Sequence, residues 1–347
     1  MTLRIAIDER ELLDAARRGD EDAFRRLVDA HRAGLHAHCY RMLGSLHDAE
    51  DAFQDTLLRA WRALGGLQGR STFWTWMYRI ATNACLDAIA RRPKRVLPID
   101  YGPPAAGGED GPEEPLSAPV WIEPYPDEVL ATEDGYASPE ARYEQRESLE
   151  LAFIAALQHL PSRQRAVLIL RDVLGFSARE TAEALDTTVP SVNAALQRAR
   201  RTAGERLPER SQQAMLRSLG DQRVRDLVRR FVDAFERGEV DAILALLVED
   251  ATFAMPPYAG WYQGRDAIGE SWLMPGGPAP RLRYAPARAN GQPAVGTYLL
   301  DRRTGRYRPI ALDVLTLRGP LIAGVLAFRM PELFPHFGLP EELPTAV

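Results

Sequence analysis

The chain has 347 residues and a formal net charge of −5, so it is long enough for two or three folded domains. Its two cysteines, Cys39 and Cys85, are too few for a disulfide framework or a paired-cysteine metal site. The sequence shows neither the apolar core of a signal peptide nor a run of membrane-spanning length. We therefore expect a soluble, cytoplasmic protein that needs no metal or cofactor and does not contact a membrane.

Charged residues are distributed unevenly along the chain, which the net charge alone does not show. Between Arg95 and Arg142 there is no lysine or arginine, whereas aspartate and glutamate are frequent. Outside this stretch basic residues outnumber acidic ones, so the overall charge does not exclude a nucleic-acid partner.

Helical periodicity dominates residues 9–95, which contain almost no proline. Apolar positions recur at three- and four-residue steps from Phe24 to Met42, and Gly44 ends this run. A second helix is predicted after Ser45. Its inward side is predicted to carry Phe53, Leu57, Leu58, Trp61 and Leu64.

The opposite side of this second helix is acidic. An acidic helix face is most often simply solvated, although it also suits the binding of a basic partner, and the residues alone leave both interpretations open. The face carries Asp48, Glu50, Asp51, Gln54 and Asp55.

The next predicted helix, residues 71–92, combines a high density of aromatic side chains with arginine. Aromatics at this density are most often part of a core. Aromatics interleaved with arginine also suit stacking on unpaired bases while phosphates are neutralised. The candidates for DNA contact are Arg70, Trp74, Trp76, Tyr78, Arg79, Asn83, Arg91 and Arg92.

Residues 97–140 are rich in proline, glycine and acidic residues, which predicts a largely extended and irregular linker. An apolar patch from Val120 to Tyr125 (VWIEPY) indicates at least one docking point along it.

Residues 177–201 predict a helix, a tight turn and a second helix. Ser177 and Glu180 have the spacing of a capping box, and Pro190 suits the first turn of the second helix. This layout is typical of a helix-turn-helix, whose second helix enters the DNA major groove, although a capped helix pair in an ordinary bundle has a similar pattern.

Two sets of motifs resemble one family. RMLGSLHDAEDAFQDTLLRAWRAL and TFWTWMYRIATNACLDAIARR resemble region 2 of sigma-70-type initiation factors of the extracytoplasmic-function (ECF) group, and residues 160–210 resemble region 4. The resemblance implies two all-α domains, region 2 at residues 1–96 and region 4 at residues 141–210. It also implies two partners, promoter DNA and core RNA polymerase with its β′ clamp helices and β flap.

The resemblance assigns a role to each surface. The acidic face would dock on the β′ clamp helices, residues 70–92 would recognise and melt the minus-ten element, and the helix-turn-helix would read the minus-thirty-five element. Members of the group often have basic residues where this chain has Asn193 and Ala195. Base contacts are therefore expected from Ser191, Asn193 and Gln197, and phosphate contacts from Arg198, Arg200 and Arg201.

Two interpretations of the linker stay open. It is either a passive tether between two DNA-binding domains or, as the resemblance implies, an acidic strand that threads the basic channel of polymerase.

Residues 211–340 extend beyond a minimal ECF factor. Asp221 to Val248 predicts two amphipathic helices with a break at Gly238, and successive antiparallel strands follow. Helices followed by a curved antiparallel sheet describe an α+β cone. The turns between strands are predicted at Asn290–Gly291, Arg303–Gly305 and Gly319–Pro320.

The phrases LLVEDATFAMPP and YQGRDAIGESW resemble the SnoaL-like branch of the nuclear transport factor two superfamily. Some actinobacterial-type ECF factors carry this appendage, which implies a regulatory domain that contacts the sigma regions. Related folds catalyse reactions in an apolar pocket with a carboxylate of raised pKa, which makes Asp313 a candidate base. The alternative is that the aromatics only fill the cone and Asp313 faces solvent. The candidate ligand pocket is Met255, Tyr258, Trp261, Tyr262, Trp272 and Asp313.

The sequence thus predicts a multidomain sigma factor, not an enzyme, with a fused regulatory domain. The alternative is a stand-alone helix-turn-helix regulator with a small-molecule-sensing C-terminal domain. Such a regulator has no use for a polymerase-binding acidic face.

Overall fold

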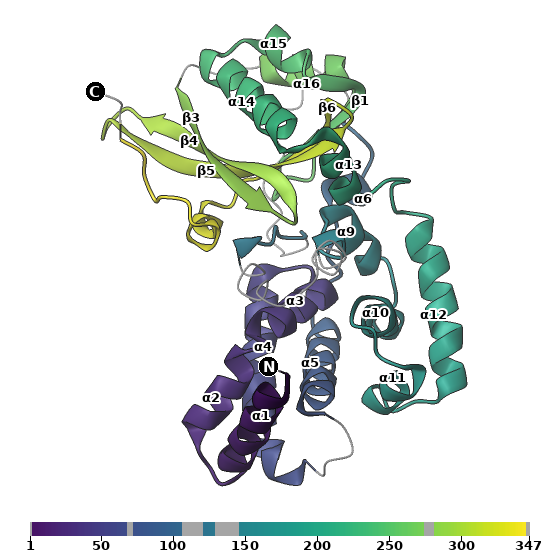
Figure 1. Cartoon of the computed structure of the whole chain (residues 1–347). Helices are drawn as coiled ribbons and strands as arrows, with labels where there is room; N and C mark the ends of the chain where they lie inside the picture. The colour runs from purple at the N-terminus through teal and green to yellow at the C-terminus, as the bar shows by residue number, and fades with distance from the viewer. Residues whose placement is uncertain (1, 68–71, 106–120, 129–145, 274–280, 345–347) are drawn as a thin grey trace. The chain divides into compact units, whose positions relative to one another are not determined.

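The computed structural model describes residues 2–67, 72–105, 121–128, 146–273 and 281–344 (Figure 1). The chain forms two compact units that interleave along the sequence. Unit 1 comprises Met1–Lys94, Glu128–Ser148 and Ala152–Leu207. Unit 2 comprises Arg95–Asp127, Leu149–Leu151 and Pro208–Val347.

The first part of unit 1 is helical, as expected, but the run from Phe24 to Met42 is not one helix. It breaks at His31, which leaves helical geometry and places its ring 3.5 Å from that of Trp74. Gly44, in the left-handed region that glycine tolerates best, ends the run, and the Ser45 side chain caps the next helix. The elements are α1 (Thr2–Arg17), α2 (Glu21–Asp29), α3 (Arg32–Leu43), α4 (Leu46–Ala63), η1 (Leu64–Gly66) and α5 (Phe73–Ile89).

The second part of unit 1 contains the helix-turn-helix. The predicted capping box is formed: the Ser177 side chain accepts from the backbone N–H of Glu180, and the Glu180 side chain accepts from the backbone N–H of Ser177. The Thr188 side chain caps the second helix. Asp186 makes the turn with a φ of 49°. The elements are α9 (Leu151–Gln158), α10 (Ser162–Leu168), η2 (Ile169–Val173), α11 (Ala178–Ala184) and α12 (Val189–Gly204).

Unit 2 is built on a six-stranded sheet with the order β2-β1-β6-β5-β4-β3. Strands β3 to β6 form an antiparallel meander with turns at the predicted positions, Asn290–Gly291 among them. The expectation of an all-antiparallel sheet is wrong, because β1 pairs in parallel with β6. The strands are β1 (Leu247–Ala254), β2 (Trp261–Gln263), β3 (Leu282–Ala289), β4 (Gln292–Asp301), β5 (Arg306–Arg318) and β6 (Leu321–Phe328).

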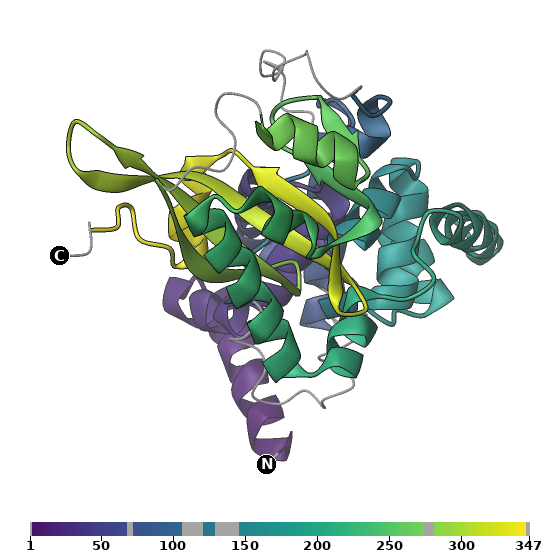
Figure 2. The same cartoon turned by 90° about the horizontal axis from the view of Figure 1, so that it is seen from above.

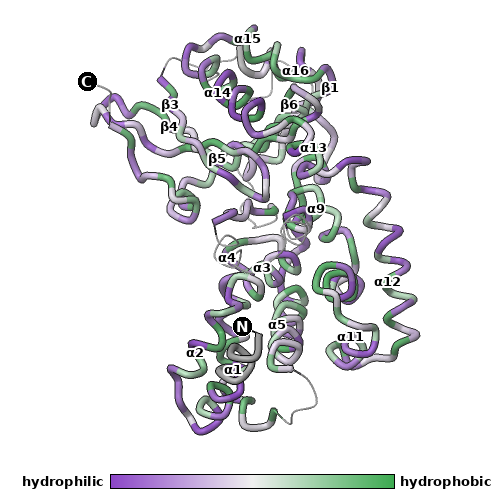
Figure 3. Tube along the Cα trace, in the orientation of Figure 1, coloured by the Kyte–Doolittle hydropathy of each residue, from purple (hydrophilic) through white to green (hydrophobic). Residues whose placement is uncertain are grey.

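Helices cover one face of this sheet, as Figure 2 shows for α14. Hydrophilic and hydrophobic residues alternate along α14 (Figure 3). Its buried Phe231 and Phe235 join a core with Leu315 and Val325 of the sheet. The second expected helix is shorter than predicted, because the apolar residues from Leu247 onward form β1 instead. The helices are α6 (Pro98–Tyr101), α13 (Gln212–Leu219), α14 (Asp221–Arg237), α15 (Val240–Leu244), α16 (Arg265–Leu273) and η3 (Pro331–Phe337).

Part of the predicted linker is folded into unit 2. The Trp121 indole Nε1 donates to Pro257 O at 2.9 Å. The backbone N–H of Asn290 donates to Tyr125 O, and the backbone N–H of Tyr125 donates to Asn290 Oδ1. Asn290 Nδ2 also donates to Leu149 O at 2.7 Å. The apolar patch therefore docks on the sheet domain of its own chain. Residues 106–120 and 129–145 of the linker lie outside the described residues.

Candidate functional sites

The acidic face of α4 is largely engaged in ion pairs. Arg92, a predicted DNA contact, pairs with both Asp48 and Asp51, and Asp48 is only 6% exposed. Arg92 is thus held by carboxylates of its own unit, although its side chain remains 41% exposed. Asp48 is buried and is not part of an exposed acidic surface.

The remaining members of this face also have partners. Asp55 pairs with Arg59 at 2.7 Å. His36 lies 3.2 Å from Glu50, and this hydrogen bond lowers the pKa of Glu50 to about 2. Gln54 donates to the same carboxylate at 2.9 Å. Glu50, Asp51 and Gln54 nonetheless remain exposed on one side of α4.

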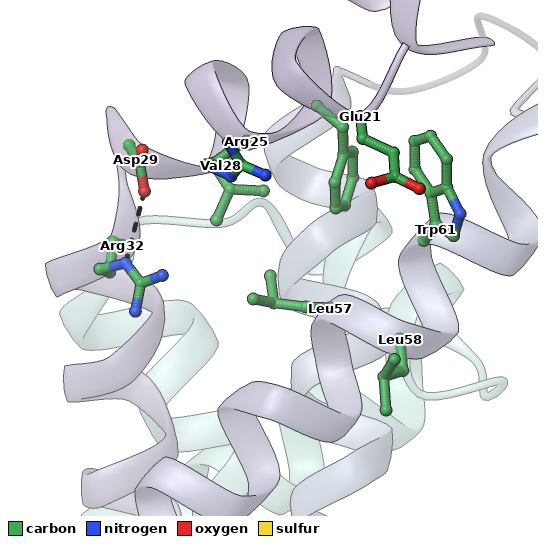
Figure 4. Close-up of a pocket in the computed structure, with 9 residues that line it drawn as sticks. Glu21, Arg25, Val28, Asp29, Arg32, Leu57, Leu58 and Trp61 are labelled. Carbon is green, nitrogen blue, oxygen red and sulfur yellow. Dashed lines mark hydrogen bonds and ion pairs between the residues drawn. The ribbon is translucent and has the colours of Figure 1, made fainter. Parts of the chain in front are cut away.

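A pocket of about 320 Å³ adjoins this side of α4 (Figure 4). It lies between α2, the start of α3, and α4. Leu58 was expected to face inward, but this was wrong: it is 57% exposed and lines the pocket. No local signal separated Leu58 from the inward residues, because Leu57, Leu58 and Trp61 all lie within the width of one apolar stripe. The lining is Glu21, Phe24, Arg25, Val28, Asp29, Arg32, Leu57, Leu58 and Trp61.

The aromatic residues of α5 divide into core and surface. Trp76 is 7% exposed and packs against Phe73, so its ring belongs to the core. Trp74 is half-buried against His31. Tyr78 is half-buried, and its ring lies between those of His38 and Phe176. Arg79, Asn83 and Arg91 are exposed, whereas Arg70 lies outside the described residues.

The second helix of the helix-turn-helix, α12, exposes the predicted reading residues. Val192, Leu196 and Ala199 are buried, which leaves the opposite face free to contact DNA. Arg200 is an exception among the phosphate candidates, because Asp172 holds its guanidinium at 2.6 and 2.8 Å. The exposed candidates are Ser191, Asn193, Gln197, Arg198, Arg200 and Arg201.

The described candidate ligand residues of the C-terminal domain are divided between the two faces of the sheet. Trp261 and Tyr262 are neighbours on β2 and therefore point to opposite faces of the sheet. Trp261 donates to Gly102 O at 2.8 Å, whereas Tyr262 joins the core beneath the helices. Met255 packs on that core, and Tyr258 lies under Arg329. The side chain of Trp272 lies outside the described residues.

Asp313 is buried on the helix-covered face of β5. Thr297 donates a hydrogen bond of 2.7 Å to its carboxyl group. Burial raises the pKa of Asp313 to about 7, and the Thr297 hydrogen bond and the charge of Arg329 oppose this rise. The interpretation that Asp313 faces solvent is therefore wrong.

Within the described part of the chain, no cluster of His, Cys, Asp and Glu suits a metal ion. No helix among the described residues is both long and apolar enough to cross a membrane.

Comparisons with protein families match three segments of the chain. Residues 27–95 match Sigma-70 region 2, residues 150–202 match Sigma-70 region 4, and residues 228–325 match the SnoaL-like domain. These segments contain α4 and α5, the helix-turn-helix, and most of the sheet, respectively.

Comparisons with individual proteins give full-length and partial similarity. The chain is 42% identical to the ECF RNA polymerase sigma factor SigG of Mycobacterium tuberculosis, over 99% of this chain and 92% of that protein. It is 30% identical to the ECF factor SigW of Bacillus subtilis over 55% of this chain and 92% of that protein. The crystal structure of SigJ from Mycobacterium tuberculosis shares the fold, with a TM-score of 0.56 and 19% identity over 90% of this chain and 98% of that chain.

Proposed function

Because the chain belongs to the ECF RNA polymerase sigma factors, we propose that the exposed side of α4 and the adjoining pocket bind the β′ clamp helices of core polymerase in the cytoplasm. Asp51, Gln54 and Leu58 follow one another at three- and four-residue steps, so they share one helix face. An exposed leucine beside a pocket, rimmed by charges, is the composition expected of a protein-binding surface. The exposure of Leu58 carries this proposal.

The promoter is contacted at two places. The exposed Arg79, Asn83 and Arg91 of α5, with Trp74 and Tyr78 as stacking platforms, engage the minus-ten element as it melts. α12 reads the minus-thirty-five element through Ser191, Asn193 and Gln197, while Arg198 and Arg201 contact phosphates. Arg200, held by Asp172, positions the helix, and the unit that carries it contacts the β flap.

The SnoaL-like domain regulates initiation by holding the linker. Trp121 and Tyr125 are hydrogen-bonded to this domain, so the linker is not free to enter the polymerase channel while these bonds persist. Binding of the linker accounts for the regulatory role without catalysis or a ligand.

Replacement of Leu58 by arginine tests the polymerase surface. The charged side chain should weaken the affinity for purified core polymerase at least tenfold, because an apolar side chain that the complex would bury is replaced by a charge that must be desolvated. Leu299→Arg is the matched control, since Leu299 is an exposed leucine of β4. Equal affinity of the two variants for core polymerase would contradict the proposal that Leu58 lies in the polymerase-binding surface.

A further inference from the structure

Within unit 2, the strands β4 and β5 continue past the end of β3 as a two-stranded ribbon (Figure 1). β3 pairs with β4 as far as Leu299, whereas β4 and β5 stay paired up to Asp301 and Arg306. The turn of the ribbon is held by its own backbone. Asp301 O accepts from Gly305 N at 2.8 Å, and Asp301 Oδ1 accepts from Arg303 N at 2.9 Å. The side chains of the turn are therefore presented from a defined backbone conformation.

The ribbon and the adjoining start of β3 are rich in arginine. Arg281 belongs to the same surface, because its backbone oxygen accepts from Leu300 N of the ribbon at 3.0 Å. Six arginines lie here, and all of them except the half-buried Arg283 are exposed. They are Arg281, Arg283, Arg302, Arg303, Arg306 and Arg308.

Carboxylates neutralise part of this positive charge. Among the described residues, the arginines of this surface pair at 3.2 to 3.8 Å with the carboxylates of Glu236, Asp301 and Glu342. The Asp301 carboxylate is also engaged by the backbone of the turn. A cluster that keeps unpaired cations attracts anions. The arginines that pair with no carboxylate in the described part of the chain are Arg281, Arg302 and Arg303.

Exposed arginines do not by themselves make a binding site, and α14 of the same unit illustrates the difference. Its exposed Arg223 and Arg230 lie three and four residues from Asp226, so charges of both signs are mixed on this face. Arg229 of α14 pairs with Asp226 at 2.6 Å. Mixed charge of this kind is typical of a solvated helix face. The two surfaces therefore allow a matched comparison within one unit.

The ribbon suits phosphate groups in its chemistry and duplex DNA in its shape. A guanidinium group donates two parallel hydrogen bonds to one phosphate, and a two-stranded ribbon fits the major groove. Contacts to phosphates add affinity without sequence information. DNA is favoured over an acidic protein, because the proposed promoter contacts hold duplex DNA on this same chain. This raises the effective concentration of DNA at any second site.

We propose that Arg281, Arg302, Arg303 and Arg306 form a sequence-independent DNA-binding site, which we call the arginine ribbon. It contacts phosphates of duplex DNA outside the two promoter elements. The SnoaL-like domain thereby takes part in DNA binding, in addition to its hold on the linker. The choice of DNA as the partner rests on the proposed promoter binding, whereas the arginine ribbon itself belongs to a different compact unit from α5 and α12.

The salt dependence of DNA binding tests the arginine ribbon in the full-length protein. The probe is a fluorescent duplex without promoter elements, so the result does not depend on the proposed roles of α5 and α12. For Arg302→Ala/Arg303→Ala, the slope of log affinity against log salt should become shallower by about 1.8, because each phosphate contact contributes about 0.9. Arg223→Ala/Arg230→Ala removes the same charge from exposed positions of α14 and should keep the wild-type slope. Equal slopes for the two double variants, or no binding by the wild type, would overturn the proposal.

A cleavage reagent attached to the ribbon gives a second readout in promoter-bound holoenzyme. A chelated iron that generates hydroxyl radicals is attached at Arg303→Cys, while Cys39 and Cys85 are buried and should not react. It should cut the DNA backbone outside the two promoter elements. The same reagent at Arg223→Cys should leave those positions intact. No cleavage from Arg303→Cys, or the same pattern from both sites, would overturn the proposal.

Further outcomes separate the arginine ribbon from other roles. Unchanged DNA binding by Arg302→Ala/Arg303→Ala, with weaker binding to core polymerase, would identify an acidic protein as the partner and overturn the proposal. At saturating protein, run-off transcription by the arginine variants should equal that of the wild type, because phosphate contacts carry no sequence information. A loss that persists at saturation would contradict a sequence-independent contact. Wild-type protein that binds the plain duplex but prefers no promoter would refute the proposed promoter roles and leave the arginine ribbon intact.

Discussion

The carboxyl group of Asp313 is a pH-sensitive element of the core. Its folded-state pKa is about 7, against an ordinary value of 3.8, because burial disfavours the charged form. Folding therefore favours the protonated form, and the free energy of unfolding decreases as the pH rises from about 4 to about 7. Between pH 5 and pH 8 the loss should be on the order of 3 kcal/mol.

Asp313→Asn removes this titration while keeping an oxygen that accepts from Thr297. The stability advantage of the variant over wild type should grow from pH 5 to pH 8 in urea unfolding followed by circular dichroism. Asp266→Asn, at an exposed position of α16, should leave the pH dependence as in the wild type. A constant difference between wild type and Asp313→Asn would show that Asp313 is ionised in both states.

Among the elements, the turn between β3 and β4 connects the linker to the sheet. Asn290 has a φ of 55°, and its side chain bonds both Tyr125 N and Leu149 O. Asn290→Gly keeps the left-handed turn and removes these bonds. We expect run-off transcription to rise severalfold, because the linker is released for polymerase.

Arg302→Ala, in the turn between β4 and β5, is the matched control for this measurement and should transcribe as the wild type does. Unchanged output from Asn290→Gly would contradict regulation through the linker. A lower output would mean that the held linker assists initiation.

Elements that depend on neighbouring residues could be predicted from the sequence. The capping box of Ser177 and Glu180 and the turn at Asn290–Gly291 formed as expected, because each is decided within a few residues. The parallel pairing of β1 with β6 and the engagement of Arg92 by Asp48 were missed. Both join residues that are distant in the chain, and no local pattern specifies such partners.

The candidate sites show the same limit. Sequence reasoning found the exposed face of α12 because helical periodicity separates it from the buried Val192 and Leu196. It placed Leu58 in the core and Trp76 among the DNA contacts, because periodicity within one helix does not show where neighbouring helices lie.

At the scale of the whole molecule, the compact units differ from the domains predicted along the chain. The expected boundaries at 96/97, 140/141 and 210/211 treat the linker as separate, whereas Arg95–Asp127 and Leu149–Leu151 belong to the unit of the SnoaL-like domain. Contacts across the chain decide this division, and composition alone does not reveal them.

A chain that ends at Leu207 should therefore expose apolar surface and self-associate. Trp121, Ile122, Tyr125 and Leu149 are buried in the intact protein and would lose their cover. We expect dye binding to exposed apolar surface and oligomers in size-exclusion chromatography. A monomer that binds no dye would show that the linker folds independently of the SnoaL-like domain.

Anchoring of the linker also changes the entropy of promoter binding. A free tether spanning residues 97–140 would keep a wide range of end-to-end distances, and fixing its ends would cost loop-closure free energy. The anchored residues 95–105, 121–127 and 149–151 have already lost this freedom on folding. The second promoter element is then bound at a smaller entropic cost but over a narrower range of spacer lengths. As long as the linker stays held, we therefore expect the chain to accept fewer spacer lengths than a sigma factor with a free tether.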